Sequence, residues 1–405
     1  MMASFVLIFL IIATIVTGND LSNIDDAEVD RLLKKLNKPA LKSIKSPDGD
    51  IIDCVHMKNH PIYDHPLFKN HTIQMRPSSF PKEWKNESLT TQNNSNMVTQ
   101  LWRTIGRCPK NSIPIIRTRR EDILQAKSIR TYGKKEPNSF PQSKPDNKPR
   151  TKTAHSYSVL ITKGRFHGAK ATISLWKPFV QTPREFSLGQ MWIASGISSS
   201  HTRETNTIES GWQVCKGLYG DYNPRYFIYW TADGYKDTGC YNLKCPGFVH
   251  VSQDFAIGAT VSHVSRVGGA QYQIPTSIWR DTRSGHWWLK VYENIFVGYW
   301  PSSLFTTLKD VATDVHWGGE ITNNRDGSKH TTTKMGSGHF AEEGYEKASY
   351  FKNIEIVDEG EFMKPPVGAY PFMSEQKCYN IKLGTDAHWG TYFFFGGPGR
   401  NPKCK

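Results

Sequence analysis

The stretch Phe227-Ile-Tyr-Trp-Thr231, followed at once by Ala232-Asp-Gly234, is typical of most of the chain. Aromatic and β-branched residues favour strands, and Asp-Gly favours a turn between them. The same combination returns at Ser277-Ile-Trp-Arg280, before the turn signal Arg283-Ser-Gly285, and at Tyr392-Phe-Phe-Phe395. Many short strands with such turns predict an all-β fold for residues 155–405, a sandwich or barrel of antiparallel sheets.

Residues 19–132, upstream of this region, predict a small α+β domain. Asp25 to Leu36 has acidic residues in its first turn, basic residues near its end and an apolar stripe, as an amphipathic helix does. The turn signal Ser46-Pro-Asp-Gly49 precedes an isoleucine-rich strand that runs into Cys54. We interpret the stripe of the helix as a packing face; it consists of Val29, Leu32, Leu33 and Leu36.

Residues 133–154 differ from both neighbours. They are rich in proline and lysine, and Phe140 is almost their only apolar residue. Such a segment cannot bury enough surface to fold by itself, so it predicts an exposed linker. Exposed linkers are preferred sites of proteolytic nicking.

Residues 1–18 are typical of a secretory signal peptide. The apolar run from Phe5 to Val16 is about 12 residues long, which is too short to span a bilayer. No later stretch is long and apolar enough to span one. We therefore expect the mature protein to be soluble and secreted, into the extracellular space, the apoplast or an acidic secretory fluid. Three N-glycosylation sequons also favour export, at Asn70, Asn86 and Asn93.

Seven cysteines in an exported chain predict disulfides rather than metal ligands. The expected pairs are Cys240–Cys245 around a short loop, Cys378–Cys404 around the C-terminal segment, and Cys54–Cys108 within the first domain. This pairing leaves Cys215 alone, either as a buried free thiol or because the pairing is wrong. The Cys-x-x-Cys spacing of a zinc site is missing, and nothing else in the sequence calls for a metal or cofactor.

The formal charge of +14 is unevenly distributed. Residues 155–405 contain 26 Lys and Arg against 22 Asp and Glu, so that most of the excess lies upstream. A basic patch is typical of nucleic-acid binding, but export argues against that partner. A basic, removable segment that covers an acidic cleft fits the distribution better.

Two glutamates have nearly mirror-image neighbours, in Glu209-Ser-Gly-Trp212 and Trp317-Gly-Gly-Glu320. Alternate residues of a strand share a face at a spacing of roughly 7 Å, so Gly211 lies beside Glu209 and Gly318 beside Glu320. We interpret the glycines as open backbone beside each carboxylate, where a polymer chain could lie. If the two strands approach each other, the carboxylates form a pair suited to acid/base hydrolysis. The alternative is two solvated glutamates beside glycines that mark bulges.

Other catalytic patterns are missing from the sequence. Gly-x-Ser-x-Gly, His-Glu-x-x-His and a glycine-rich phosphate loop do not occur. No nucleophile motif surrounds Cys215, which fits a core thiol better. His316 shares a face with Glu320, so the candidates for substrate contact are Gly211, Gln213, His316 and Gly318. Trp212 and Trp317 fall on the face opposite the glutamates, where we expect the core.

Several ordered motifs resemble the plant neprosin family. They run from residue 25 or so to the C-terminus and also include the family's activation peptide. The motifs are Ser46-Pro-Asp-Gly-Asp-Ile-Ile-Asp-Cys54, Asp64-His-Pro-Leu67, Phe186-Ser-Leu-Gly-Gln-Met-Trp192, Asn206-Thr-Ile-Glu-Ser-Gly-Trp-Gln-Val214, Tyr219-Gly-Asp221, Tyr229-Trp-Thr-Ala-Asp-Gly-Tyr235, Thr238-Gly-Cys-Tyr-Asn-Leu243, Gly298-Tyr-Trp-Pro-Ser302, Trp317-Gly-Gly-Glu320, Thr333-Lys-Met-Gly-Ser-Gly-His-Phe340 and Phe395-Gly-Gly-Pro-Gly399.

The resemblance implies an antiparallel β-sandwich with the activity of a glutamic endopeptidase that cuts after proline at acid pH. The catalytic glutamates of the family correspond to Glu209 and Glu320. Two departures stand near the first of them: Cys215-Lys216 replaces an expected proline-containing dipeptide, and Ser210 replaces the more usual alanine. Neither removes a catalytic residue.

The implied mechanism needs no cofactor. Two nearby carboxyls cannot both ionise cheaply, so they share one proton. The ionised one takes a proton from a water that attacks the scissile carbonyl, and the protonated one donates to the oxyanion or to the leaving nitrogen. The sequence does not say which glutamate has which role.

The expected partners are a proline-containing peptide or protein substrate and the chain's own pro-domain as an inhibitor. The enzyme would be made as a zymogen and could cut its own linker after Pro141, Pro145 or Pro149. Nothing suggests obligate assembly, so we expect a monomer. The alternatives are a carbohydrate-binding or glycoside-cleaving β-sandwich, which also uses paired carboxylates and aromatic grooves, and a family member without catalytic activity.

Overall fold

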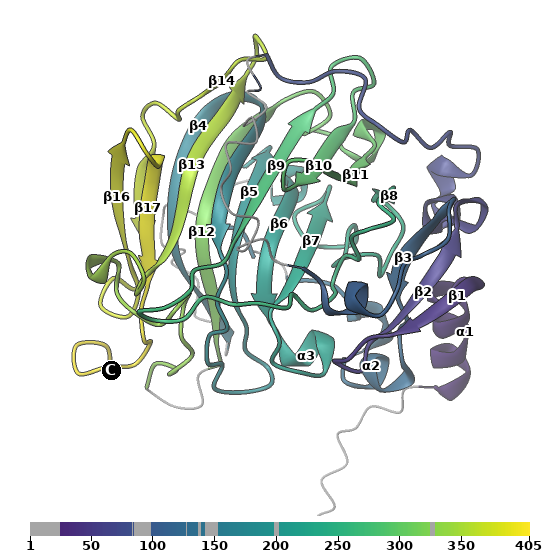
Figure 1. Cartoon of the computed structure of the whole chain (residues 1–405), viewed down its shortest axis with the longest axis horizontal. Helices are drawn as coiled ribbons and strands as arrows, with labels where there is room; N and C mark the ends of the chain where they lie inside the picture. Colours follow the sequence, from purple (N-terminus) through teal and green to yellow (C-terminus); the bar gives the residue numbers. More distant parts are fainter. Residues whose placement is uncertain are drawn as a thin grey trace, which may run out of the picture.

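Fourteen strands joined by hydrogen bonds form one large curled antiparallel sheet, with a small α+β region at one end (Figure 1). The computed structural model describes residues 25–82, 84, 99–126, 128–136, 139–141, 153–197, 202–324 and 329–405. The all-β fold of the larger region and the α+β character of the smaller one are therefore both confirmed. The predicted signal peptide and the sequon residues Asn86 and Asn93 lie outside the described residues, and Asn70 is exposed.

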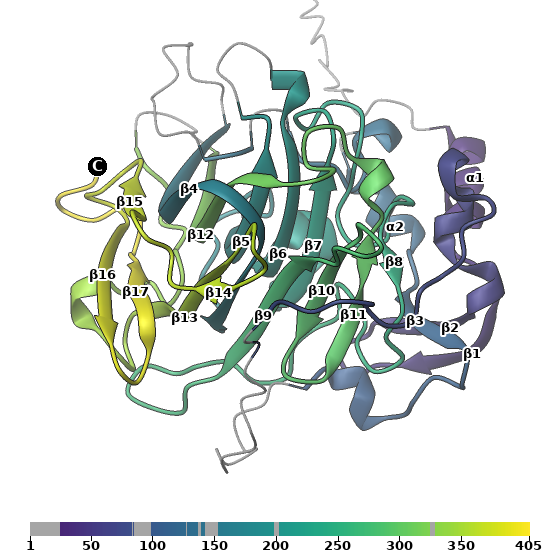
Figure 2. The ribbon, with the colours of Figure 1, turned by 90° about the horizontal axis from the view of Figure 1, so that it is seen from above.

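One long strand, β4 (Thr153–Ser174), makes the sheet curl into two layers. The first half of β4 pairs with β12 on one edge and β15 on the other, whereas its second half pairs with β9 and β13. Figure 2 shows the result from above, with β5, β6 and β7 in one layer and β9, β10 and β11 in the other. The first layer consists of β7 (Arg225–Thr231), β6 (Asn206–Val214), β5 (Ser187–Ser195), β12 (Ala312–Asn324), β4 and β15 (Tyr370–Met373).

The second layer begins at the other half of β4. Its strands on one side are β9 (Gln273–Arg280), β10 (Trp287–Val291), β11 (Ile295–Trp300) and β8 (Val249–His250). Those on the other side are β13 (Ser349–Asp358), β14 (Met363–Lys364), β17 (Gly390–Gly396) and β16 (Asn380–Asp386). Short helices connect the strands: η7 (Thr202–Glu204), α3 (Lys216–Tyr219), η8 (Ser302–Leu304) and η9 (Ala341–Glu343).

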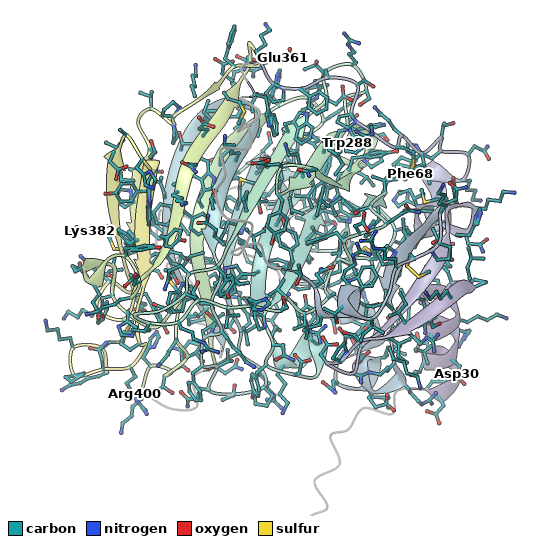
Figure 3. All side chains as sticks on the ribbon, viewed as in Figure 1. Asp30, Phe68, Trp288, Glu361, Lys382 and Arg400 are labelled. Atoms are coloured by element: carbon teal, nitrogen blue, oxygen red, sulfur yellow. A yellow bond between two sulfur atoms is a disulfide. The ribbon has the colours of Figure 1, made fainter. Side chains whose placement is uncertain are left out.

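The main hydrophobic core fills the space between the two layers. Trp212 and Trp317 enter it from the first layer, and Trp279 and Trp288 enter it from the second. All four are at most 1% exposed, and in Figure 3 Trp288 lies among the interior side chains. The prediction that Trp212 and Trp317 are core residues is confirmed, so the glutamates of the same strands point away from this core.

A second apolar cluster covers the opposite face of the first layer. It includes Tyr157, Trp192 and Tyr229 from the strands, and Phe140, Tyr235 and Tyr241 from segments that lie over them. This face carries the candidate site, since the side chains that alternate with the core residues point here.

The N-terminal region is a three-stranded sheet with helices around it. Asp25 caps the first helix through a hydrogen bond from the Ala27 N–H at 3.0 Å, and Val29 of the predicted stripe is buried. The elements are α1 (Asp26–Leu36), β1 (Ala40–Lys45), β2 (Ile51–His56), η1 (Met57–Asn59), η2 (Pro61–Asp64), η3 (Pro66–Phe68), η5 (Leu101–Thr104), β3 (Ser112–Ile116), α2 (Arg120–Leu124) and η6 (Ile129–Thr131). None of the helices in the described part of the chain has the length and apolar content to cross a membrane.

In its described part the expected linker, residues 133–154, packs against the larger domain and is not an exposed tether; residues 137–138 and 142–152 lie outside the described residues. Lys135, Ser139 and Phe140 are at most 8% exposed. The ring of Phe140 packs against that of His316, with centroids 4.7 Å apart. The segment has too few apolar residues to form a core of its own, but the larger domain supplies the surface that buries it.

All seven cysteines are described, and six of them form the disulfides Cys54–Cys108, Cys240–Cys245 and Cys378–Cys404. These are the pairs that the sequence predicted. Cys215 has no disulfide partner.

Candidate active site

Glu209 lies in the middle of β6, between two other strands of the first layer. Trp192 of β5 stands opposite it on one side, and Tyr229 of β7 stands opposite it on the other. Its neighbours Ile208 and Ser210 point to the opposite face, as strand alternation requires. The carboxylate is therefore fixed on the face that the second apolar cluster covers.

Glu320 lies on β12, which is not adjacent to β6. Strand β5 runs between them, with Leu188 opposite Glu320 and Trp192 opposite Glu209. The two glutamate strands are therefore not hydrogen-bonded neighbours. The strand between them carries Gln190, which stands opposite Gly318 on one side and Gly211 on the other.

The carboxylate of Glu209 accepts hydrogen bonds at both oxygens. Thr207 Oγ1 and the Tyr235 hydroxyl donate to Oε1, at 3.0 and 2.7 Å. Gln190 Nε2 donates to Oε2 at 3.0 Å, and the Lys135 ammonium pairs with the same oxygen. Glu209 is 0% exposed, so these four donors replace water around a buried charge.

Glu320 is held differently. Its Oε1 lies 2.5 Å from Nδ1 of His155, a residue at the start of β4. Its Oε2 is buried without a well-aligned hydrogen bond among the described residues, but the carboxylate interacts with the hydroxyl of Tyr157, which stands opposite Glu320 on β4. Glu320 is also 0% exposed.

The two carboxylates act on the same groups. The pKa of Tyr157 is raised well above its ordinary value by burial, then by the negative charge of Glu320 and then by that of Glu209. The pKa of Tyr241 is raised in the same way by burial and by charges that include both glutamates. Both glutamates therefore favour the neutral form of the same two hydroxyls, although two strand spacings separate their backbones.

The glycines beside the glutamates have a different role from the one expected. A Cβ on Gly211 would lie 2.1 Å from the carbonyl oxygen of Gly189, and a Cβ on Gly318 would lie 2.2 Å from that of Ser158. Gly318 also has a φ of +154°, which a side chain would strain. Both glycines allow neighbouring strands to approach closely, and they do not leave open backbone for a substrate.

Gln213 and His316, the other two predicted contact residues, lie on the same face as the glutamates, but neither forms a hydrogen bond to them in the described structure. The Gln213 amide donates to the Tyr219 hydroxyl at 2.7 Å. His316 is buried below Phe140, and neither ring nitrogen has a hydrogen-bond partner within the described chain, although Nε2 lies 4.0 Å from Asp314 Oδ1. Burial, with a smaller effect from Lys163, lowers the pKa of His316 to about 3, so the ring is neutral.

Cys215 does not have the properties of a nucleophile. Burial raises the pKa of its thiol to about 11, whereas a reactive cysteine needs a lowered pKa. Among the described residues, one group of possible metal ligands lies together, namely His330 with Cys378 and Cys404. The disulfide between these two cysteines uses both sulfurs.

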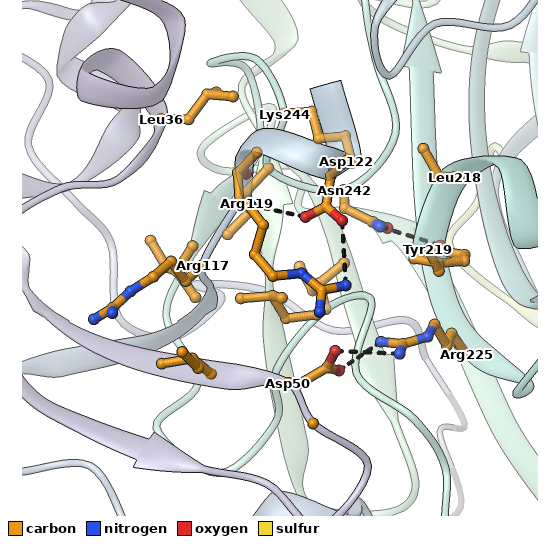
Figure 4. A pocket seen from close by; sticks show the side chains of 17 residues that line it. Leu36, Asp50, Arg117, Arg119, Asp122, Leu218, Tyr219, Arg225, Asn242 and Lys244 are labelled. Atoms are coloured by element: carbon orange, nitrogen blue, oxygen red, sulfur yellow. Dashed lines mark hydrogen bonds and ion pairs between the residues drawn. The ribbon is translucent and has the colours of Figure 1, made fainter. Parts of the chain in front are cut away.

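A separate pocket lies where the N-terminal region meets β7 (Figure 4). Arg225 forms ion pairs there with Asp50, at 2.5 Å, and with Asp221, at 2.7 Å. The Arg225 side chain is 2% exposed and that of Asp50 is 9% exposed. This pocket is part of the contact between the two regions and does not include either glutamate.

Sequence reasoning missed the residues that surround the carboxylates. Gln190 and Tyr235 occur within the motifs quoted above, so alternation along β5 could have placed Gln190 on the site face. His155, Tyr157 and Lys135 carried no local signal, because each reaches the site from a distant part of the chain.

The profile of the family described as Neprosin matches residues 183–398, which include both glutamates. The chain belongs to the neprosin family. A second profile, described as the neprosin activation peptide, matches residues 43–161. This neprosin therefore contains an activation-peptide domain upstream of its main domain, and the match extends over Lys135 and His155.

Solved structures of glutamic peptidases are also similar to the neprosin chain, at low levels. Scytalido-glutamic peptidase with a peptide-based transition-state analogue has 10% identity and a TM-score of 0.32, covering 61% of this chain and 98% of its own. SCP-B, an eqolisin-family peptidase in complex with the tripeptide Ala-Ile-His, has 10% identity and a TM-score of 0.30, covering 60% and 96%. The β-porphyranase BpGH16B of Bacteroides plebeius has 7% identity and a TM-score of 0.21, covering 44% and 67%. At these TM-scores the likenesses do not bear on the function of this chain.

Proposed function

We propose that this neprosin is the secreted precursor of a glutamic endopeptidase that cuts peptide bonds after proline at acid pH. The observation that carries the proposal is that Glu209 and Glu320 share one buried face, with Gln190 on the strand between them. Two carboxyls and an amide in a water-poor site are the groups that acid/base hydrolysis of an amide needs.

In the proposed mechanism, one glutamate takes a proton from a water and the other carries the proton that the oxyanion or leaving nitrogen receives. The surrounding donors prepare this arrangement. Thr207, Tyr235 and Gln190 fix the orientation of Glu209, and His155 fixes that of Glu320. Because the mechanism needs one protonated carboxyl, activity should decrease as the pH rises toward neutrality.

The precursor is inactive in this proposal because its own activation segment covers the site. Lys135 pairs with Glu209, and Phe140 packs on His316 four residues before Glu320 along β12. Both carboxylates are 0% exposed, so a substrate reaches them only after this segment leaves. Cleavage of the chain within or beside the activation segment would make its release from the site permanent.

Specificity for proline and secretion are the parts of the proposal that depend most on the family. The site face is rich in aromatic rings that proline packs against, including Trp192, Tyr229 and Tyr235. The apolar run at the N-terminus supports export.

The test is a digest of a proline-rich protein by acid-treated precursor from about pH 3 to pH 7, with Glu209→Gln and Glu320→Gln beside the wild type. We expect each substitution to lower the rate by roughly 10² to 10⁴-fold. The exposed Glu204→Gln, close to Glu209 in sequence, is the matched control and should keep full activity. Peptides ending in proline from the wild type alone support the proposal. An active Glu320→Gln enzyme, or release of reducing sugar in place of peptides, contradicts it.

A further inference from the structure

The side chain of Lys135 ends in a cage made by the main domain. Its ammonium pairs with Glu209 and lies 5.2 Å from the ring centroid of Tyr229, 5.7 Å from that of Tyr241 and 5.9 Å from that of Phe227. The side chain is 3% exposed. A buried ammonium is costly unless a carboxylate and π faces compensate for the lost water, and this cage supplies both.

Backbone contacts align the segment with the cage. The Tyr241 N–H donates to the carbonyl oxygen of Gly133 at 2.8 Å, and the Lys135 N–H donates to the Tyr229 hydroxyl at 3.1 Å. The neighbouring Lys134 points elsewhere, since its ammonium donates to the carbonyl oxygen of Asp237 at 2.8 Å. Of these two adjacent lysines, only Lys135 therefore enters the cage.

The residues that form the walls of the cage all belong to the main domain. Phe227 and Tyr229 belong to β7, Tyr241 lies in the loop after it, and Glu209 lies on β6. Tyr235 and Gln190, which also bond to the Glu209 carboxylate, belong to the main domain as well. We therefore expect the site to remain organised for a cation after Lys135 leaves.

We propose that Glu209, Phe227, Tyr229 and Tyr241 form a binding subsite for a primary alkylammonium group, which Lys135 fills in the precursor. In the precursor, Lys135 occupies this subsite and thereby blocks Glu209, one carboxylate of the pair. In the processed protein it accepts the lysine side chain of a peptide, with the cleaved segment itself as the first candidate. This consequence for catalysis rests on the proposed function, whereas the binding of the ammonium does not.

The test uses the full-length precursor and chemical replacement of the missing side chain. Lys135→Ala removes the part of the side chain that n-propylammonium reproduces, and n-propanol is its neutral analogue. We expect n-propylammonium to raise the thermal midpoint of Lys135→Ala and to bind at least about tenfold more tightly than n-propanol. The matched control Lys134→Ala and the double variant Lys135→Ala/Glu209→Gln should not show this preference.

Equal effects of the two ligands on Lys135→Ala, or an equal preference in Lys134→Ala, would overturn the proposal. If Lys135→Ala does not fold alone, both ligands are added during refolding. Recovery with n-propylammonium only supports the subsite, and no recovery or equal recovery overturns it. Because the readout is stability and not hydrolysis, a precursor that binds the ammonium but never cleaves a peptide would reject the proposed function and keep the subsite.

Discussion

His60 should couple docking of the activation domain to pH. The ring is 1% exposed, with its Nδ1 accepting a hydrogen bond from the Ile62 N–H at 2.9 Å and its Nε2 lying 3.1 Å from the carbonyl oxygen of His250. Because Nδ1 accepts from the Ile62 N–H, a neutral ring carries its proton on Nε2, where it can donate to the His250 carbonyl, although the His250 N–H also lies 3.1 Å from that nitrogen. A second proton on Nδ1 would face another donor. Burial, with the nearby His250 and His71, lowers the pKa of His60 from 6.5 to about 3.

The sign of the effect follows from this lowered pKa. The docked state binds fewer protons than the released state, so docking is strongest above about pH 6.5 and weakens as the pH falls toward 3. A pH of about 4.5 is about two units below the ordinary pKa of 6.5 that His60 has when it is released. The cost to the docked state is then about 3 kcal/mol, which favours release by roughly a hundredfold.

The substitution that isolates this effect is His60→Asn, made in a Glu320→Gln background to prevent self-cleavage. The asparagine oxygen can accept the Ile62 N–H in place of Nδ1, and asparagine does not titrate. Hydrogen–deuterium exchange of residues 57–71 between about pH 7 and pH 4 measures release. We expect the increase in opening on acidification to be roughly a hundredfold smaller in the variant than in the parent.

His56 provides a matched control within the same domain. Its Nδ1 caps η1 by accepting the Lys58 N–H at 3.0 Å, as that of His60 caps η2. His60 also contacts His250 of the main domain, so only His60→Asn should alter the pH profile of docking. Exchange profiles of His60→Asn and its parent that superimpose across this pH range would refute the reasoning.

Two further substitutions test the fold around the site. Arg225→Met leaves Asp50 buried without its cation, so urea unfolding should show a free energy of unfolding lower by about 3–5 kcal/mol, whereas the exposed Arg283→Met should change it by less than about 0.5 kcal/mol. Gly211→Ala pushes a Cβ against the backbone of β5 and should cost about 1–3 kcal/mol or more in the same assay, whereas Gly269→Ala, with its nearest neighbour at 3.5 Å, should be nearly neutral. Unchanged stability of Gly211→Ala would show that β5 and β6 separate easily.

The parts of the fold that the sequence predicted are those that depend on local pattern. Alternation alone placed Trp212 in the core and Glu209 on the opposite face, because adjacent positions of a strand always point apart. The helix predicted over Asp25 to Leu36 was visible from its charges and apolar stripe for the same reason, and it forms over residues 26–36. These predictions needed no knowledge of which strands are neighbours.

The site depends on strand order and long-range contacts, which local pattern does not contain. Nothing in the sequence places β5 between the two glutamate strands, so the position of Gln190 between the glutamates was not predictable. The glycine beside each glutamate was read as open space because the approach of the adjacent strand was unknown. Lys135 and Glu209 are 74 residues apart, and the lysine lies in a segment whose composition predicted an exposed linker.

In the proposed function, inhibition and catalysis both involve a single oxygen atom of Glu209. Glu209 Oε2 receives both the Lys135 ammonium and the Gln190 amide. Loss of the lysine leaves Gln190 as the remaining described donor to that oxygen and uncovers the rings of Tyr229 and Tyr241. A water that enters there meets an acceptor already oriented by Gln190, Thr207 and Tyr235, so departure of one residue both unblocks and completes the proposed site. For this reason the strength of docking at distant contacts such as His60 should determine how often Glu209 is free, even though His60 is far from it in the sequence.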